Sequence, residues 1–241
     1  PAKLPLTVAV IALDAESQIG PLLASAGFAD EQVVVDSGSR DGTVALAQRM
    51  AARVVHQDWL GFGRQKQFAV SAARHDWVLC LDADERLSPE LADSIRAAMA
   101  GPPAATAFRT ARRNRFLGRW LRHGEGYPDW NLRLFDRRHA RWTEDPVHEH
   151  VVADGKVARL AGDLLHESAA SPENYPAKQT RSPPLQAAAM HARGERASAL
   201  RIACSPVARF LRFYVLKLGF LDGIAGFAHV AIGAFASFLK Y

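Results

Sequence analysis

The amino-acid sequence predicts an α/β protein with a Rossmann-like, mostly parallel sheet, a smaller antiparallel hairpin region and a C-terminal helical appendage. Strand and helix patterns alternate through residues 1–103, which is typical of a parallel sheet covered by helices on both faces. Beyond residue 104 the strand-like runs are shorter, and Asp154-Gly155 between two of them indicates a tight hairpin. From about Pro172 the pattern becomes helical.

Apolar runs in residues 1–103 predict strands, and a helical pattern follows each of them. The expected strands are 7–13, 33–36, 54–55 and the run that starts at Trp77. The expected helices are 16–26, 43–51, 64–73 and one that begins at Pro89. Ser88 is the expected N-cap of this last helix, and Gly101-Pro102-Pro103 ends it.

The later residues complete the main domain and add a helical region. Strand-like runs lie at 105–110, 132–136, 150–153 and 156–165. We expect one domain over 1–168, divided into halves at 1–103 and 104–168, and a helical region over 169–241. Within that region the prolines of Arg181-Ser182-Pro183-Pro184 interrupt a segment that we expect to be helical.

Composition narrows the class of protein. The chain has 241 residues, of which 49% are hydrophobic and 23% charged, and this composition excludes wholesale disorder. A net charge of +5 favours an anionic partner, which leaves nucleotides, nucleic acids and membrane surfaces open. The two cysteines, Cys80 and Cys204, are expected to be reduced, and no charged-then-apolar leader precedes the first strand. We therefore expect a cytoplasmic protein.

The most informative stretch is the buried strand that starts at Trp77 and ends in Asp82-Ala83-Asp84-Glu85. Side chains alternate along an extended backbone, so Asp82 and Asp84 are expected to point the same way. Two neighbouring carboxylates repel each other unless a cation lies between them, and a divalent ion bridging to a phosphate meets that need. The alternative is a strand that stops in a solvated acidic turn.

A second candidate site follows the second strand. Asp36 ends this strand, and the small residues of 37–43 lead into the next helix. A carboxylate at a strand end can accept hydrogen bonds from a ribose or a base edge, while small residues let a ligand approach the backbone. The alternative is an ordinary strand–turn–helix connection with Asp41 as the N-cap.

Together these segments resemble glycosyltransferase family 2, whose members have the GT-A fold. The resemblance rests on the order and spacing of several segments across nearly the whole chain: Asp14-Ala15-Glu16, 36–43, 82–85, 130–135, 146–149, 162–166 and 217–223. The later segments are similar to the branch that contains the lipopolysaccharide inner-core β-glucosyltransferases. The resemblance implies a nucleotide-binding half at 1–103 and an acceptor half at 104–168.

The resemblance also implies roles for individual residues. The nucleoside and sugar of the donor would contact Asp14, Glu16, Asp36, Lys66 and Asp82. At position 14 the family usually has Asn, so the detail of the nucleobase contact differs here. Mg²⁺ or Mn²⁺ on the donor diphosphate would be held by Asp84 and His166. The alternative for His166 is a hydrogen-bonded histidine at the end of a hairpin.

An inverting transfer needs one carboxylate base for the acceptor hydroxyl, because a divalent metal neutralises the leaving diphosphate. The acids in the right region are Glu144, Asp145 and Glu149. We rank Glu149 first, because His148 and His150 flank it, and Asp145 second. For each of them the alternative is an exposed loop acid.

A basic cluster extends from Phe108 to Arg122 without an acid. It is expected to be a solvated face or a loop that grips a phosphorylated acceptor, because the arginine fork suits phosphate. Apolar residues are interleaved with the arginines, so contact with an anionic membrane surface is a further alternative; no nucleic-acid motif accompanies them, and nucleic acid is not expected. The residues expected to contact the acceptor are Arg112, Arg113, Arg115, Trp130 and Arg133.

Near the C-terminus, Arg209, Arg212 and Lys217 are followed by a mainly apolar run over 218–239. Asp222 and several glycines argue against a transmembrane span. We expect amphipathic helices on the cytoplasmic leaflet of the inner membrane; the alternative is a helical pair packed on the domain or on a second subunit.

The sequence therefore predicts a peripheral inner-membrane glycosyltransferase that moves a hexose, with glucose from UDP-glucose first in rank, onto a heptose of the lipopolysaccharide inner core. Two alternatives stand beside it. One is another family 2 activity, on a polyprenyl phosphate or a polysaccharide. The other is a non-catalytic, membrane-associated protein that binds sugar nucleotides or polyanions.

Overall fold

A computed structural model describes residues 3–145, 149–167 and 198–240. The chain divides into two compact units, each described by itself below. The first consists of Pro1–Arg112 and Trp130–His166, and the second of Arg113–Asp129 and Glu167–Tyr241.

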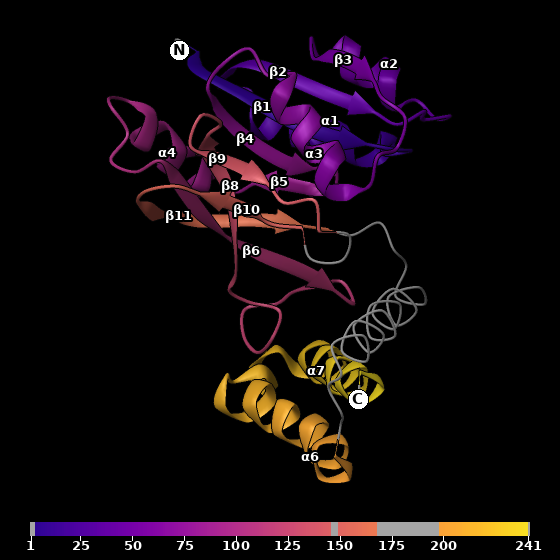
Figure 1. Cartoon of the computed structure of the whole chain (residues 1–241). Helices are drawn as coiled ribbons and strands as arrows, with labels where there is room; N and C mark the ends of the chain where they lie inside the picture. Colours follow the sequence, from indigo (N-terminus) through magenta and orange to yellow (C-terminus); the bar gives the residue numbers. More distant parts are fainter. Residues whose placement is uncertain (1–2, 146–148, 168–197, 241) are drawn as a thin grey trace. The chain divides into compact units, whose positions relative to one another are not determined.

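The first unit contains a mixed sheet with a parallel half (Figure 1). Its parallel strands lie in the order β3-β2-β1-β4, with bounds β1 Leu4–Ala12, β2 Ala29–Asp36, β3 Arg53–His56 and β4 Trp77–Asp82. Val8 pairs with Gln32 on one side and with Leu79 on the other. This arrangement confirms the α/β class and aligns the carboxyl ends of β1, β2 and β4 at one edge.

Beyond β4 the sheet continues with strands from the second half of the sequence. The order is β4-β8-β6-β11-β5, with bounds β5 Glu85–Leu87, β6 Ala107–Phe116, β8 Asp129–Asp136 and β11 Val157–His166. Strand β8 is antiparallel to β4, with Trp77 opposite Asp136, and β11 is antiparallel to β5, with His166 opposite Glu85. The last pairing brings the end of β11 to the acidic turn after β4.

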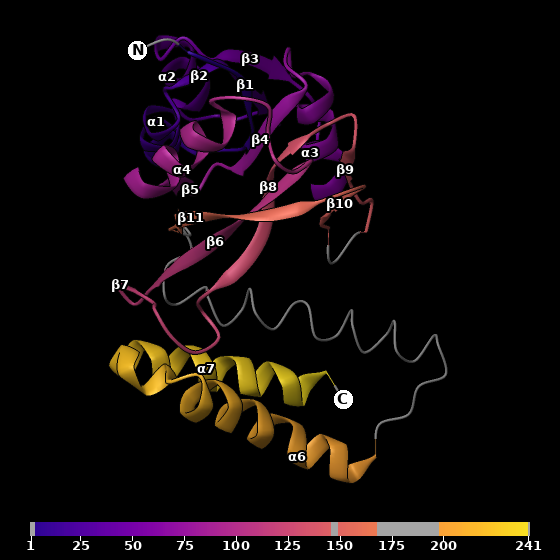
Figure 2. The same cartoon turned by 90° about the vertical axis from the view of Figure 1, so that its left-hand side faces the viewer.

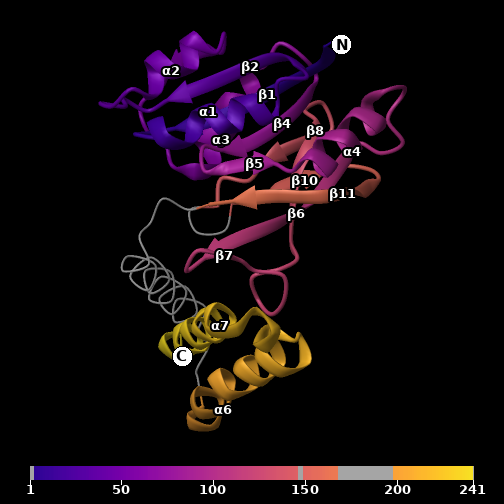
Figure 3. The same cartoon turned by 180° about the vertical axis from the view of Figure 1, so that it is seen from behind.

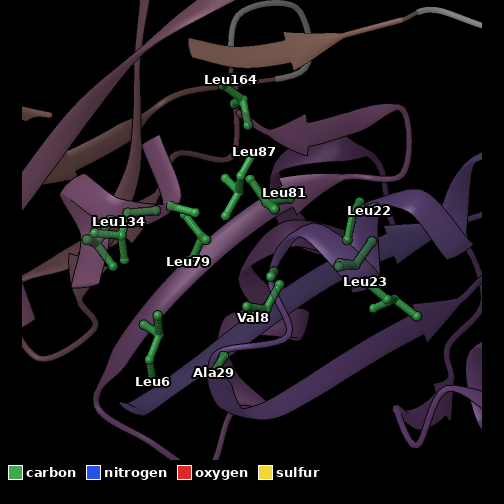
Figure 4. Packing of buried hydrophobic residues seen from close by; sticks show 14 of the residues in the cluster. Leu6, Val8, Leu22, Leu23, Ala29, Leu79, Leu81, Leu87, Leu134 and Leu164 are labelled. Carbon is green, nitrogen blue, oxygen red and sulfur yellow. The ribbon is translucent and has the colours of Figure 1, made fainter. Parts of the chain in front are cut away.

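The parallel strands β1, β2 and β4 are buried on both faces. Leu6, Val8 and Val10 point to one face, where α1 (Glu16–Ser25), α2 (Thr43–Arg49) and α4 (Pro89–Met99) cover them. Figure 4 shows part of this core, including Leu6 and Val8 with Leu22 and Leu23 of α1. Ala9 and Ile11 point to the opposite face, where they pack with α3 (Phe62–Ser71) and Trp142. The alternation of these buried residues follows the two-residue repeat of an extended backbone.

Helix α4 begins where the sequence predicts it. The Ser88 hydroxyl accepts a hydrogen bond from the Leu91 amide (3.2 Å), and Pro89 occupies the first turn. The helix packs on β11, beside which it lies in Figure 3. Gly162 permits this contact, because a Cβ there would lie 2.2 Å from the Leu91 nitrogen.

We predicted that the strands on either side of Asp154-Gly155 pair with each other in a hairpin, and this prediction is wrong. Gly155 has a φ of +97°, so a turn is present, but β10 (Val151–Ala153) pairs with β9 (Ala140–Trp142) in a separate two-stranded sheet. After the turn the chain enters β11 of the large sheet, and the Thr106 hydroxyl donates to the Asp154 carbonyl (2.9 Å). The turn therefore connects two sheets.

In the second unit, helices α6 (Ala199–Phe210) and α7 (Gly223–Leu239) run side by side (Figure 2). A π-helical segment, Leu211–Leu216, and a 3₁₀ turn, Gly219–Asp222, connect them. The expected interruption at 181–184 lies outside the described residues, as does the start of helical structure expected near Pro172.

The arginine-rich segment after residue 108 is a β-hairpin and does not form a loop. The end of β6 pairs with β7 (Arg119–Trp120), and Leu117 and Gly118 make the turn with φ values of 49° and 75°. Within the second unit Phe116 and Leu121 pack on Ala225 of α7. Residues 113–129, which we expected in the acceptor half, thus share a core with the C-terminal helices.

Candidate active site

Asp36, Asp14 and Glu16 surround one loop at the carboxyl ends of β1 and β2. Asp36 is buried and accepts hydrogen bonds from the backbone N–H groups of Gly38 (2.9 Å) and Ser39 (3.1 Å). Asp14 Oδ1 accepts from the Arg40 amide (2.7 Å), and Glu16 Oε2 accepts from the Gly42 amide (3.1 Å).

The three acids therefore order the backbone of residues 38–42, which would face a ligand at this edge of the sheet. Asp41 accepts hydrogen bonds from the Thr43 amide (3.0 Å) and hydroxyl (2.5 Å), and the N-cap position of α2 is Gly42. The alternative interpretation made Asp41 the N-cap of this helix. In the structure Asp41 lies one residue before the N-cap, and its side chain accepts hydrogen bonds from Thr43.

Asp82, at the end of β4, is held by two buried cations. Lys66 Nζ from α3 lies 3.0 Å from Asp82 Oδ1, and Arg133 Nη2 from β8 lies 2.8 Å from Oδ2. The side chains of Lys66 and Arg133 are only 5% and 3% exposed. Burial alone raises the pKa of Asp82, but the charges of Arg133 and Lys66 outweigh it and hold that pKa well below its usual range.

Glu85 is a member of this cluster that sequence reasoning missed. Its side chain is fully buried, 2.6 Å from Arg133 Nη2 and 3.7 Å from Arg112 Nη1, and it accepts a hydrogen bond from the Asp82 amide (3.0 Å). Residues 83–84 form a turn, so the alternation expected for Asp82 and Asp84 stops at Asp82. No local sequence signal separates a buried Glu85 from a solvated one, because its partners come from distant strands.

Lys66 also binds the first-ranked base. Its Nζ lies 3.1 Å from Glu149 Oε1 and 4.7 Å from the centre of the Trp142 ring. The Glu149 side chain is 19% exposed, so it is partly accessible to a ligand. One ammonium group therefore connects an acid at the strand end to the candidate base.

The other acids near Glu149 have different surroundings. Glu144 is 67% exposed and pairs with Arg64 (2.7 Å), and Asp145, our second-ranked base, is exposed. His148, expected to flank Glu149, lies outside the described residues, and His150 is exposed. Of the three acids considered, Glu149 is the one that the structure brings to Asp82.

Asp84 and His166 form a hydrogen-bonded pair, an arrangement that fits the alternative interpretation of His166 as well as a metal site. His166 Nε2 lies 3.2 Å from Asp84 Oδ2, and both side chains are largely buried. Over residues 3–145, 149–167 and 198–240, His, Cys, Asp and Glu side chains nowhere gather in threes that could hold a metal. The carboxylate is a ligand that suits Mn²⁺ or Mg²⁺, and the remaining positions of such an ion would be filled by phosphate oxygens and water.

The residues expected to contact the acceptor are distributed between the two units. Arg133 is buried beneath Asp82, and Trp130 of β8 is covered by the Arg159 guanidinium, 4.6 Å from its ring centre. In the second unit, Arg113 Nε donates to the Leu121 carbonyl (3.2 Å), and Arg115 pairs with Glu167. Within the first unit Arg112 is 27% exposed, beside Glu85.

Several known proteins are similar to this chain in sequence. The sequence profile of "Glycosyl transferase family 2" matches residues 7–153. A protein of Rhizobium meliloti (strain 1021), named lipopolysaccharide core biosynthesis glycosyltransferase LpsC, is 32% identical over 98% of this chain and 90% of its own length. A glycosyltransferase of Rickettsia bellii (strain RML369-C) is 31% identical over 88% of this chain and 76% of its own.

Among solved structures, glucosyl-3-phosphoglycerate synthase from Mycobacterium tuberculosis, crystallised with Mn²⁺, UDP and glucosyl-3-phosphoglycerate, has a TM-score of 0.39. The match has 23% sequence identity and covers 46% of this chain and 44% of that one.

Proposed function

The chain belongs to glycosyltransferase family 2 and has the GT-A fold, and from this premise we propose an inverting, metal-dependent transfer of a hexose to the lipopolysaccharide inner core. We propose glucose from UDP-glucose as the donor group and a heptose as the acceptor. The name of the Rhizobium relative supports the class of acceptor. The observation that carries the proposal is the bridge from Asp82 through Lys66 to Glu149.

The donor would lie along the carboxyl ends of β1, β2 and β4. Asp36, Asp14 and Glu16 order the loop that would receive the nucleoside, and Asp82 stays ionised between Lys66 and Arg133. Asp84 and His166 would hold Mg²⁺ or Mn²⁺ beside the diphosphate. When bound, that ion neutralises the charge that develops on the leaving diphosphate.

Glu149 would take the proton of the acceptor hydroxyl. A base positioned within hydrogen-bonding distance contributes typically about 10²–10⁴-fold to the rate. Attack from the face opposite the diphosphate inverts the anomeric carbon, so one carboxylate suffices. Lys66 fixes the Glu149 carboxylate in place, because the ammonium is itself held by Asp82 and by the face of Trp142.

We also place the protein at the cytoplasmic surface of the inner membrane, where a lipid-linked acceptor is found. The net charge of +5 and the exposed apolar residues of the second unit support this location. In the described part of the chain, Gly219–Leu239 is long and apolar enough to cross a membrane by length and composition alone. A self-associating surface on the C-terminal helices is the competing proposal.

Thermal stabilisation by a panel of nucleotides and nucleotide sugars, with and without Mn²⁺, tests the donor site. A ligand that binds the folded state raises the melting temperature according to its affinity. We expect stabilisation by a UDP-sugar that depends on the metal. Asp84→Ala should abolish the metal dependence, while Asp93→Ala, at an exposed acid on α4, should retain it. Equal metal-dependent stabilisation of all three proteins would contradict the assignment.

Glu149→Gln tests the base. Turnover should be lost, because the amide cannot accept the proton, while donor affinity should stay close to that of the wild type. Loss of donor binding in this variant would instead give Glu149 a structural role.

A further inference from the structure

The end of the π-helical segment, the 3₁₀ turn after it and the start of α7 expose several large apolar side chains. Leu216 is 77% exposed and Ile224 is 83% exposed, although both are large aliphatic residues. We name this surface the apolar tip, and it consists of the exposed residues Val215, Leu216, Leu218, Phe220, Leu221 and Ile224. Contiguous exposed apolar residues on a folded unit mark an interaction surface.

Close backbone packing at Gly219 and hydrogen bonds to the buried Asp222 hold the conformation of the apolar tip. Leu218 adopts a φ of 57°, and a Cβ on the buried Gly219 would lie 2.7 Å from the Phe213 carbonyl oxygen. Asp222 is 2% exposed and accepts hydrogen bonds from the Arg122 amide (2.9 Å) and the His123 amide (2.8 Å). The acidic side chain is thus turned inward and the apolar side chains outward.

Basic residues border the apolar tip. Arg119 Nη2 donates to the Leu221 carbonyl (3.2 Å), which places its guanidinium beside the turn. Arg122, Arg212 and Lys217 are exposed within the turn or the segments that contact it. Asp222 is the one acid between residues 207 and 240, and it is buried. The exposed charge of this region is therefore positive.

We propose that the apolar tip inserts into the headgroup–acyl boundary of a bilayer that contains anionic phospholipid. The apolar side chains would enter the boundary, and the bordering arginines and Lys217 would contact lipid phosphates. This inference rests on the proposed function, because it supplies the contact with the membrane that holds the acceptor. The proposal also specifies the contact: the apolar tip enters the lipid boundary, and α7 stays packed in the second unit.

The packing of α7 distinguishes this arrangement from a transmembrane span. Ala225 packs on Phe116 and Leu121, and Val230 and Ala234 of the same helix are buried. A spanning segment would have to give up these contacts and take Asp222 away from its backbone donors, which is costly in hydrocarbon. Insertion of the apolar tip leaves both intact.

Vesicle flotation tests the proposal with the whole 241-residue chain. The wild type should float with vesicles of phosphatidylcholine and phosphatidylglycerol and bind pure phosphatidylcholine more weakly. The double variant Leu216→Glu/Ile224→Glu should lose at least about tenfold in binding to the mixed vesicles. The matched control, Val152→Glu/Val157→Glu, changes two exposed valines of the first unit and should bind as the wild type does. Arg212→Ala should weaken binding by about fivefold on mixed vesicles.

A second measurement keeps the test valid if the double variant unfolds. Leu216→Trp should show a blue-shifted emission on mixed vesicles and quenching by brominated acyl chains. Metal-dependent stabilisation by UDP should be unchanged in every variant, because the donor residues lie in the first unit; its loss in the wild type would count against the proposed function alone.

Three results would overturn the proposal: no flotation of the wild type, equal flotation of the Leu216→Glu/Ile224→Glu variant, or a dimer that this variant dissociates while vesicle binding persists.

Discussion

At the scale of single residues, Asp82 depends on two cations that are themselves buried. Taking Lys66 and Arg133 out of water is costly. The cost is offset by their ion pairs with the two oxygens of the Asp82 carboxylate, at 3.0 Å and 2.8 Å. The result is a carboxylate whose position and charge are set before any ligand arrives. Such preorganisation is what a site needs if the binding energy of the donor is to be used for catalysis.

Replacing Arg133 by Met should therefore be strongly destabilising. Glu85 would remain fully buried, with the Arg112 guanidinium 3.7 Å away as its nearest cation among the described residues. Breaking a buried pair by removing one partner costs about 3–5 kcal/mol, and urea denaturation would measure the loss. Arg109→Met, at an exposed arginine of β6, should stay within about 0.5 kcal/mol of the wild type. A loss below 1 kcal/mol in Arg133→Met would show that Glu85 is solvated.

The lowered pKa of Asp82 also gives the stability a dependence on pH. Because its folded pKa lies below the unfolded value of about 3.9, the ionised form stabilises the fold above that pH. This contribution is lost progressively as the pH falls below about 4. We expect the difference in unfolding free energy between the wild type and Asp82→Asn to be constant from pH 5 to 7 and to shrink towards pH 3. A difference that does not change with pH would contradict the assignment of the shift to this carboxylate.

At the scale of elements, α3 packs against Thr143 and Glu149 at Gly63. A Cβ at Gly63 would lie 2.1 Å from the Thr143 carbonyl oxygen and 3.4 Å from Glu149 Cβ. The backbone at 143 has to move before any larger residue fits. The position of the candidate base thus depends on a residue that carries no side chain.

Gly63→Ala should lower the turnover number by about 10²-fold, because a misplacement of 1 Å can cost that much. Steady-state kinetics with a soluble acceptor would measure it. Gly101→Ala, which meets no atom within 4 Å, is the matched control and should turn over normally. Normal turnover in Gly63→Ala would indicate that the Glu149 segment adjusts without loss.

Most elements of residues 1–103 were predictable because their signals are local. The continuous apolar runs of β1 and β2, and Ser88-Pro89 at the start of α4, can be recognised from neighbours in the sequence. Strand β5 was missed, because its three residues pair with β11 far along the chain. The same limit explains the error at Asp154-Gly155, where a correct turn signal gave no information about which sheet the next strand joins.

At the scale of the whole molecule, the described chain has separate cores in its two units. Leu79 and Phe135 are buried in the first, and Phe116 and Leu121 with Ala225 form the core of the second. Asp222 links residues 122–123 to the C-terminal helices inside the second unit. Burial raises the pKa of Asp222, and the backbone hydrogen bonds from Arg122 and His123 outweigh it and lower that pKa.

Asp222→Ala should therefore destabilise the second unit alone. Losing hydrogen bonds to a buried carboxylate costs about 1.5–3 kcal/mol. Hydrogen exchange should become faster in α7 and in residues 113–129, while protection in β1 and β4 and stabilisation by UDP with Mn²⁺ should not change. Equal loss of protection in both units would show that they unfold together.

The sequence predicted the part of the candidate site whose residues lie at the ends of strands. Asp36, Asp82 and His166 terminate β2, β4 and β11, as expected. We expected Arg133 to contact the acceptor, but it is buried and pairs with Asp82. The sequence does not distinguish these two roles, because they depend on the pairing of β8 with β4. The basic cluster was ambiguous for the same reason, since its division between two units depends on three-dimensional contacts.

The two cysteines differ in burial, so their reaction with a thiol reagent can report local unfolding of the first unit. Cys80 is fully buried on β4, and burial raises the pKa of its thiol to about 12, whereas Cys204 is exposed. Because the thiolate is the reactive form, an alkylating reagent at neutral pH should modify Cys204 at once and Cys80 only after the first unit opens. A Cys204→Ser protein would therefore carry one silent label site two residues from Asp82. The rate at which the reagent labels Cys80 would record how much each bound nucleotide slows the opening of the strand that ends in Asp82.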